Sequence, residues 1–243
     1  MDETLPRRRF LLGAGLAGTA VATGLTPALP TQAEAQTAPA APAAKPQTNA
    51  EPDTYLTLTA TEVAFFSAAA DTIIPADELS PSGTDCGIVT FIDRQLAGAW
   101  GGGAKMYRSG PFRKGKPEQG YQLPLTPAQL YRAGIEATNA HCRKIYGKAF
   151  DRLDEKQREE VLVGLSTAKI TFDSGLPVNA FWSTVYQTVM QGMFSDPIYG
   201  GNRNKAGWKL IGFPGVVAVH RENVEKYRGK KYTADILGIE DLS

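Results

Sequence analysis

Three helix-start signals, spread along the chain, constrain its fold most strongly. Thr59-Ala60-Thr61-Glu62 has the pattern of a capping box, in which the hydroxyl and the carboxylate each accept a hydrogen bond from the other residue's backbone N–H. Thr126-Pro127-Ala128-Gln129 combines a cap with a first-turn proline, and Asp154 to Gln157 resembles a further cap. Apolar residues follow the first signal at helical spacing, and the third leads into the apolar residues Val161, Leu162 and Leu165. We therefore predict three helices, the first ending at Pro75 and the second at about Tyr146.

Two further helices are expected from apolar periodicity, one from Gly87 to Gly98 and one from Pro177 to Phe194. The second is the clearest amphipathic pattern, with a stripe that is more typical of a core face than of a cofactor site. Its members are Trp182, Val185, Val189 and Met193. No clear β pattern is present. We predict a mainly α fold, a single irregular helical domain over residues 54–243 with long ordered loops.

The amino terminus has the features of an export signal. Arg7 and Arg8 precede Phe10 and Leu11, a weakly apolar stretch follows, and residues 33–35 form a small-x-small cleavage pattern. This arrangement is typical of a twin-arginine signal peptide, predicted over residues 1–35 and read by the twin-arginine translocase. Both cleavage after residue 35 and retention as an uncleaved anchor stay open.

Residues 36–53 are rich in alanine and proline and offer no large apolar side chain to bury. Such a composition is typical of a disordered or polyproline-like tether. We predict a linker between the signal peptide and the helical domain.

Charge and composition name no partner or cofactor. The chain has 26 Lys and Arg against 25 Asp and Glu, so charge gives no reason to expect nucleic-acid binding. It has two histidines, His141 and His220, and no C-x-x-C-H haem motif or G-x-S-x-G nucleophile elbow. We expect no catalytic, metal or cofactor site in this chain. Because twin-arginine signals typically export proteins that fold around a cofactor first, we expect that cofactor in a companion polypeptide.

The region from Gly98 to Pro124 is long, rich in glycine and basic, and we predict no regular structure there. Its cations between residues 105 and 116 are Lys105, Arg108, Arg113, Lys114 and Lys116. The loop is either a solvated surface or an interface packed on a partner. Contact with an acidic substrate stays open.

The segment from Ser195 to Gly215 contains five glycines, two prolines and three large aromatic residues. Glycine and proline disfavour a regular helix, while aromatic residues and arginine are enriched at interface hot spots. We predict an ordered loop that docks on a partner subunit. The candidate interface residues are Ser195, Asp196, Pro197, Tyr199, Asn202, Arg203, Trp208, Lys209 and Phe213.

This segment, with residues 70–75, Gly120-Tyr121-Gln122 and Leu125-Thr126-Pro127, resembles the gluconate 2-dehydrogenase subunit 3 family. The resemblance covers most of the predicted domain. It implies a non-catalytic small subunit of a membrane-bound sugar or sugar-acid dehydrogenase. The implied partners are a large subunit that holds FAD and a cytochrome subunit that holds several haem c groups. The implied location is the periplasmic face of the cytoplasmic membrane, with the small subunit's signal exporting the large subunit too.

Cys86 and Cys142 would reach an oxidising compartment, where cysteines tend to form disulfides. An internal bridge, an intersubunit bond to the large subunit and two unpaired thiols all stay open. The alternative function is a stand-alone exported binding protein or hydrolase that has no redox partner.

Overall fold

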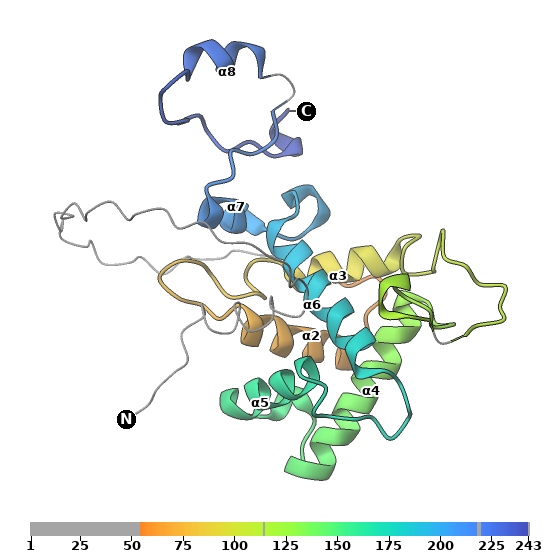
Figure 1. Cartoon of the computed structure of the whole chain (residues 1–243). Coiled ribbons are helices and arrows are strands. Elements are labelled where there is room, and N and C mark those ends of the chain that lie inside the picture. Colours follow the sequence, from red (N-terminus) through yellow and green to blue (C-terminus); the bar gives the residue numbers. More distant parts are fainter. Residues whose placement is uncertain (1–53, 114, 218–219, 243) are drawn as a thin grey trace, which may run out of the picture. The chain divides into compact units, whose positions relative to one another are not determined.

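The described residues of the computed structural model are 54–113, 115–217 and 220–242, and they contain seven α-helices and no β-strand (Figure 1). The five longer helices are α2 (Ala60–Ile73), α3 (Ile88–Ala97), α4 (Pro127–Tyr146), α5 (Glu155–Ser166) and α6 (Val178–Phe194). The two short ones are α7 (Ala206–Ile211) and α8 (Arg221–Lys226). The prediction of a mainly α fold is confirmed. The signal peptide, with Arg7, Arg8, Phe10 and Leu11, and the linker lie outside the described residues, so both stay predictions.

Short 3-10 turns connect several of these helices. They are η1 (Pro117–Gln119), η2 (Phe150–Arg152), η3 (Pro197–Tyr199), η4 (Arg203–Lys205) and η5 (Ile239–Leu242). Outside η1, the described residues between α3 and α4 have no regular structure, as predicted. One isolated β-bridge joins Gly215 to Leu237 in parallel orientation.

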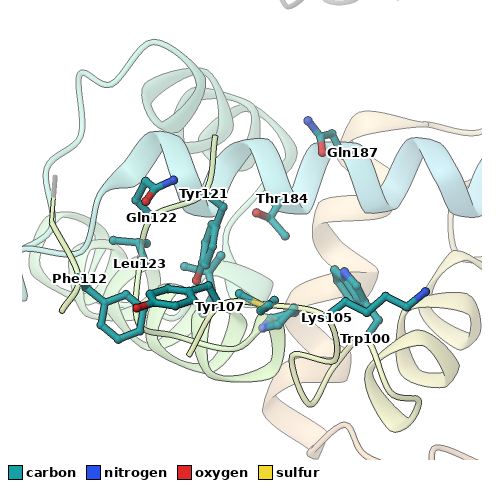
Figure 2. A pocket seen from close by; sticks show the side chains of 12 residues that line it. Trp100, Lys105, Tyr107, Phe112, Tyr121, Gln122, Leu123, Thr184 and Gln187 are labelled. Carbon is teal, nitrogen blue, oxygen red and sulfur yellow. The ribbon is translucent and has the colours of Figure 1, made fainter. Parts of the chain in front are cut away.

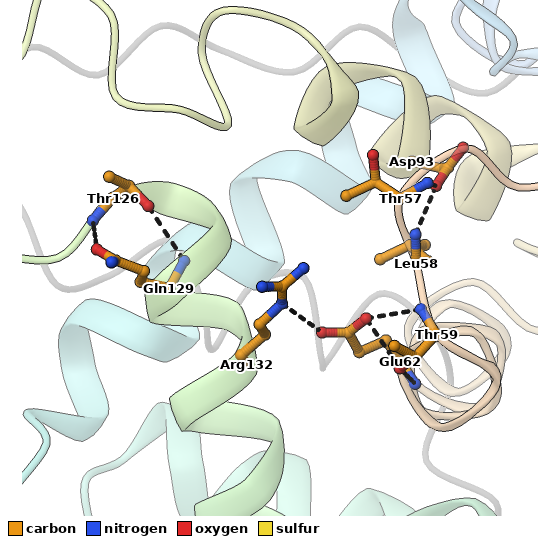
Figure 3. Close-up of polar contacts among 8 residues, drawn as sticks. All are labelled: Thr57, Leu58, Thr59, Glu62, Asp93, Thr126, Gln129 and Arg132. Atoms are coloured by element: carbon orange, nitrogen blue, oxygen red, sulfur yellow. Dashed lines mark hydrogen bonds and ion pairs between the residues drawn. The ribbon is translucent and has the colours of Figure 1, made fainter.

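All three predicted caps form capping boxes. The Thr59 backbone N–H donates to the Glu62 carboxylate at 2.7 Å, and the Thr126 N–H donates to the Gln129 side-chain oxygen at 2.9 Å (Figure 3). Glu62 also makes an ion pair with Arg132 of α4, with 3.4 Å between Oε1 and Nε. The cap of α2 is therefore also a link between α2 and α4.

The core is a cluster of aromatic rings contributed by four elements. The centroid of the Phe65 ring lies 4.9 Å from that of Phe150 and 6.1 Å from that of Phe181. The centroids of the Phe66 and Tyr131 rings are 5.1 Å apart. All five side chains are at most 1% exposed. Burial raises the pKa of Tyr131, whose hydroxyl donates to Thr188 Oγ1 at 2.6 Å. The cluster joins α2, α4 and η2 to α6.

Helix α6 contacts α3, α4, α5 and α7. The stripe predicted as its core face is buried, with exposed fractions of 8% or less for all four residues. The position of α6 matters for function because the glycine-rich segment starts directly at its carboxyl end.

Asp93 of α3 holds the first described residues in place. Asp93 is 1% exposed, and its carboxylate accepts the backbone N–H groups of Leu56, Thr57 and Leu58 at 2.6–2.9 Å. Figure 3 shows Asp93 with Thr57 and Leu58. A carboxylate that accepts several N–H groups forms stronger hydrogen bonds than a neutral acceptor. The chain is therefore fixed to α3 before α2 begins.

Gly134 allows α4 and α6 to approach closely, and its replacement gives the first prediction. A Cβ atom at this position would lie 2.0 Å from the Phe181 ring, which is held inside the aromatic core. Although alanine favours helices, we expect Gly134→Ala to lower the free energy of unfolding by about 1–3 kcal/mol because the core becomes overpacked. Urea unfolding of the purified chain measures this value.

The matched control is Gly102→Ala. Apart from its own chain neighbours, the nearest atom to a Cβ at residue 102 would be the backbone oxygen of Ala99, at 3.7 Å. We expect a change within about 0.5 kcal/mol. A Gly134→Ala chain as stable as the control would contradict the close approach of α4 and α6.

Candidate subunit interface

Residues 195–215, called the glycine-rich segment below, reverse the chain at the end of α6. The Ser195 N–H ends the helix by donating to Gln191 O at 2.7 Å. Asp196 then caps η3: its Oδ1 accepts from the Ile198 N–H at 3.1 Å, and its Oδ2 accepts from the Ile239 N–H at 2.9 Å. Asp196 is 8% exposed. This carboxylate therefore fastens the carboxyl-terminal residues to η3 and faces the chain's own backbone.

Asn202 is the centre of the reversal. It is fully buried and adopts a left-handed conformation with φ of 47°, which asparagine tolerates better than most residues. Its Nδ2 donates to Ser195 O at 2.8 Å, and its Oδ1 accepts from the Gly207 N–H at 2.8 Å. The side-chain amide thus joins the end of α6 to the start of α7.

Two glycines let the segment pack directly on the backbone of α6. A Cβ atom at Gly201 would lie 2.3 Å from Gly192 O, and one at Gly207 would lie 2.0 Å from Met193 O. Real Cβ atoms do not approach backbone oxygens so closely, so a larger residue at either position would displace the segment. The glycines predicted to prevent helix formation have a packing role at these positions.

The prediction that this segment contains no regular helix is wrong. It contains η3, η4 and the six-residue helix α7. Gly212 ends α7 in a left-handed conformation with φ of 68°, where glycine is favoured. A glycine at a helix end, such as Gly212, is compatible with a helix, so the number of glycines alone does not exclude one.

Trp208 lies inside the protein. It is 4% exposed, its Nε1–H donates to Phe194 O at 2.8 Å, and the Phe213 ring packs edge-on at 5.0 Å. The sequence placed Trp208 at a subunit interface. The structure assigns it instead to the contact between α7 and the end of α6.

Arg203 is also engaged within the chain. Its Nη2 donates to Thr90 Oγ1 at 3.2 Å, and its backbone N–H donates to Cys86 O at 3.0 Å. Arg94 of α3 reaches the same region, with Nη1 donating to Ile198 O at 3.3 Å. These bonds tie the glycine-rich segment to α3.

The part of the segment that a partner could contact is a set of exposed apolar side chains. They are Ile198 (38% exposed), Tyr199 (49%), Leu210 (38%), Ile211 (59%) and Phe213 (40%). Among the other candidate residues, Lys209 is exposed, while Ser195 and Pro197 are half-buried. An open hollow lined by Phe91, Met190, Phe194 and Tyr199 adjoins this set. Interface cores are enriched in such aromatic and apolar residues.

The predicted interface residues do not include Ile198, Leu210 or Ile211. Spacing offers no signal for them, because consecutive apolar residues also occur in the core, where Phe65 and Phe66 of α2 are both buried.

Both cysteine side chains are buried. Cys86 is 1% exposed and Cys142 is fully buried with a free thiol, so the internal bridge between them is not formed in this structure. Burial raises the pKa of the Cys142 thiol to about 11. A thiol that is buried and protonated reacts slowly, because the thiolate is the nucleophile.

Within the described residues, no group of three or more His, Cys, Asp and Glu side chains could hold a metal ion. None of the helices in the same part of the chain is long and apolar enough to cross a membrane. The chemistry that the described surface supports is association through apolar contacts.

The comparison with protein families agrees with this description. The model of the family described as gluconate 2-dehydrogenase subunit 3 matches residues 60–215, from α2 to the end of the glycine-rich segment. Since the match covers more than half of the chain, this protein belongs to that family, and the resemblance drawn from the sequence is confirmed. No curated protein and no solved structure matches the chain significantly.

The internal position of Trp208 predicts a folding defect upon its removal. We expect Trp208→Ala to lower the free energy of unfolding of the isolated chain by about 3–5 kcal/mol, through lost burial and a lost hydrogen bond. Ile211→Ala, at an exposed position of the same helix, should change it by no more than about 0.5 kcal/mol. Urea unfolding compares the two. A Trp208→Ala chain as stable as the wild-type chain would contradict the buried position of Trp208.

Burial of Cys142 predicts slow alkylation. At pH 8 the thiolate population should be about a hundredfold lower than for an exposed thiol, and the folded chain also shields the sulfur. We expect iodoacetamide to leave the Cys142 peptide unmodified in the folded chain and to modify it fully in guanidinium, as measured by mass spectrometry. Rapid modification of the folded chain would mean that this region opens readily.

Proposed function

We propose that this chain is the non-catalytic small subunit of a membrane-bound, periplasm-facing, FAD-dependent dehydrogenase of the gluconate 2-dehydrogenase type. Its role is to bind and stabilise the flavoprotein large subunit and to carry the twin-arginine signal that exports it. The observation that carries the proposal is family membership over residues 60–215. The family's name describes a subunit, which implies association with other polypeptides.

The exposed apolar residues of the glycine-rich segment support the association. Ile198, Tyr199, Ile211 and Phe213 are each more than a third exposed, although the backbone that carries them is fixed by buried hydrogen bonds. A fixed scaffold with exposed apolar side chains loses little conformational entropy upon binding. This surface, with Lys209 at its edge, is where we place the contact with the large subunit.

The cofactors of the proposed complex belong to its other subunits. Covalent attachment of haem c uses two cysteines separated by two residues and followed by histidine, whereas this chain has only Cys86 and Cys142. We assign FAD to the large subunit and haem c to a cytochrome subunit that passes electrons towards membrane quinone. This chain contributes binding and export.

Affinity purification of the tagged chain from gently solubilised membranes of its native host tests the proposal. We expect a larger polypeptide, a flavin absorbance spectrum and dye-linked oxidation of a sugar or sugar acid in the eluate. A colourless, inactive single chain would contradict the proposal. It would favour the alternative, a stand-alone exported binding protein or hydrolase.

The export role predicts a location defect. We expect replacement of Arg7 and Arg8 by lysine to abolish dehydrogenase activity in intact cells assayed with a membrane-impermeant dye, while lysed cells retain activity. The charge is unchanged, so the effect would report on recognition of the arginine pair. Arg9→Lys, the neighbouring residue, is the matched control and should leave activity at the periplasmic face. Normal activity in intact cells of the double variant would contradict the export role.

A further inference from the structure

A second surface, separate from the glycine-rich segment, is lined by aromatic side chains (Figure 2). Trp100, Tyr107, Phe112 and Tyr121 of the long loop, together with Leu123 and with Gln187 of α6, enclose part of an open cavity of about 470 Å³. We call it the aromatic groove. Its four rings are between 38% and 68% exposed, which is unusual for residues of this size.

The rings of the groove are held in place by hydrogen bonds within the chain. The Tyr107 hydroxyl donates to Gly110 O at 2.6 Å, and the Tyr121 hydroxyl donates to Leu125 O at 2.7 Å. Burial raises the pKa of Tyr121 to about 12, so this hydroxyl stays protonated and continues to donate. The Trp100 ring packs edge-on against the buried Tyr131 at 6.3 Å. The groove is therefore formed before any ligand arrives.

The loop that forms most of the groove is mainly basic. Residues 98–126 contain five basic residues and a single acidic one, Glu118. Lys105 lines the groove itself, and Arg108, Arg113 and Lys116 are exposed on the same loop. Since interfaces pair opposite potentials, this distribution favours a partner that carries carboxylates.

We propose that the aromatic groove receives an acidic peptide segment of the flavoprotein partner, with an apolar or aromatic side chain inserted among the rings. The carboxylates of that segment face Lys105 and Arg113. This inference rests on the proposed function and adds a second contact, which lies at residues 184 and 187 of α6 and not at its carboxyl end. A concave groove suits an inserted side chain, whereas binding to a lipid surface uses protruding apolar residues.

Photo-crosslinking tests which molecule occupies the groove. Tyr107 is 68% exposed and is replaced by p-benzoylphenylalanine in the full chain, and the purified complex is irradiated and analysed by mass spectrometry. We expect crosslinks to a large-subunit peptide that contains several Asp or Glu residues. Ile145 on α4, 58% exposed, is the control position and should not crosslink to that peptide.

The other outcomes overturn the inference. They are crosslinks to residues 36–53 of this chain, to a second copy or to lipid, and no crosslink in an intact complex. If the wild-type chain brings down no flavoprotein, the proposed function fails and this inference fails with it. If the complex forms but Tyr107 crosslinks elsewhere, only the groove assignment fails.

Charge reversal gives an independent measurement. We expect Lys105→Glu combined with Arg113→Glu to weaken binding of the large subunit about tenfold at low salt, with a smaller difference at high salt because ions screen exposed charges. Lys148→Glu combined with Lys169→Glu applies the same change in charge at exposed positions outside the groove. Equal affinity of the two double variants would overturn the acidic-partner assignment.

Discussion

The side-chain amide of Asn202 fixes the reversal of the chain after α6, because it forms hydrogen bonds to the backbone on both sides of that reversal. It accepts from the Gly207 N–H and donates to Ser195 O, and it has no exposure to water. A buried amide that lost one of these partners would leave a polar backbone group unsatisfied. The positions of α7, of the Trp208 ring and of the exposed residues beyond it all depend on this bridge.

The two surfaces differ in the way the fold produces them. In the glycine-rich segment, the backbone packs closely on α6, and apolar side chains stay exposed at the surface. In the aromatic groove, the loop uses tyrosine hydroxyls to satisfy its own carbonyls and so orients the rings. The chain's own hydrogen bonds hold both proposed association surfaces in place, so binding at either one would cost little conformational entropy.

The sequence predicted the helix caps and the buried face of α6 correctly, but it did not predict the environment of Trp208. Capping at Thr59, Thr126 and Asp154 depends on residues three positions apart, so the sequence contains the whole interaction. Burial of Trp208 depends on Phe194 O, fourteen residues away, and the aromatic groove gathers residues from 100 to 187. Contacts of that range follow from the path of the chain, which spacing alone does not specify. Composition made Trp208 resemble an interface residue because cores and interfaces use the same side chains.

The match to the family ends at residue 215, yet residues within the matched region also contact residues beyond it. Asp196 and Lys205, both inside the matched region, take partners from the last residues: Ile239 N–H for the carboxylate, and Ile236 O with Asp241 for the ammonium group. Gly215 itself pairs with Leu237. The region shared with relatives is therefore not a self-sufficient physical unit in this chain. Trimming the protein to its recognised region would remove the tail that completes it and expose a buried carboxylate.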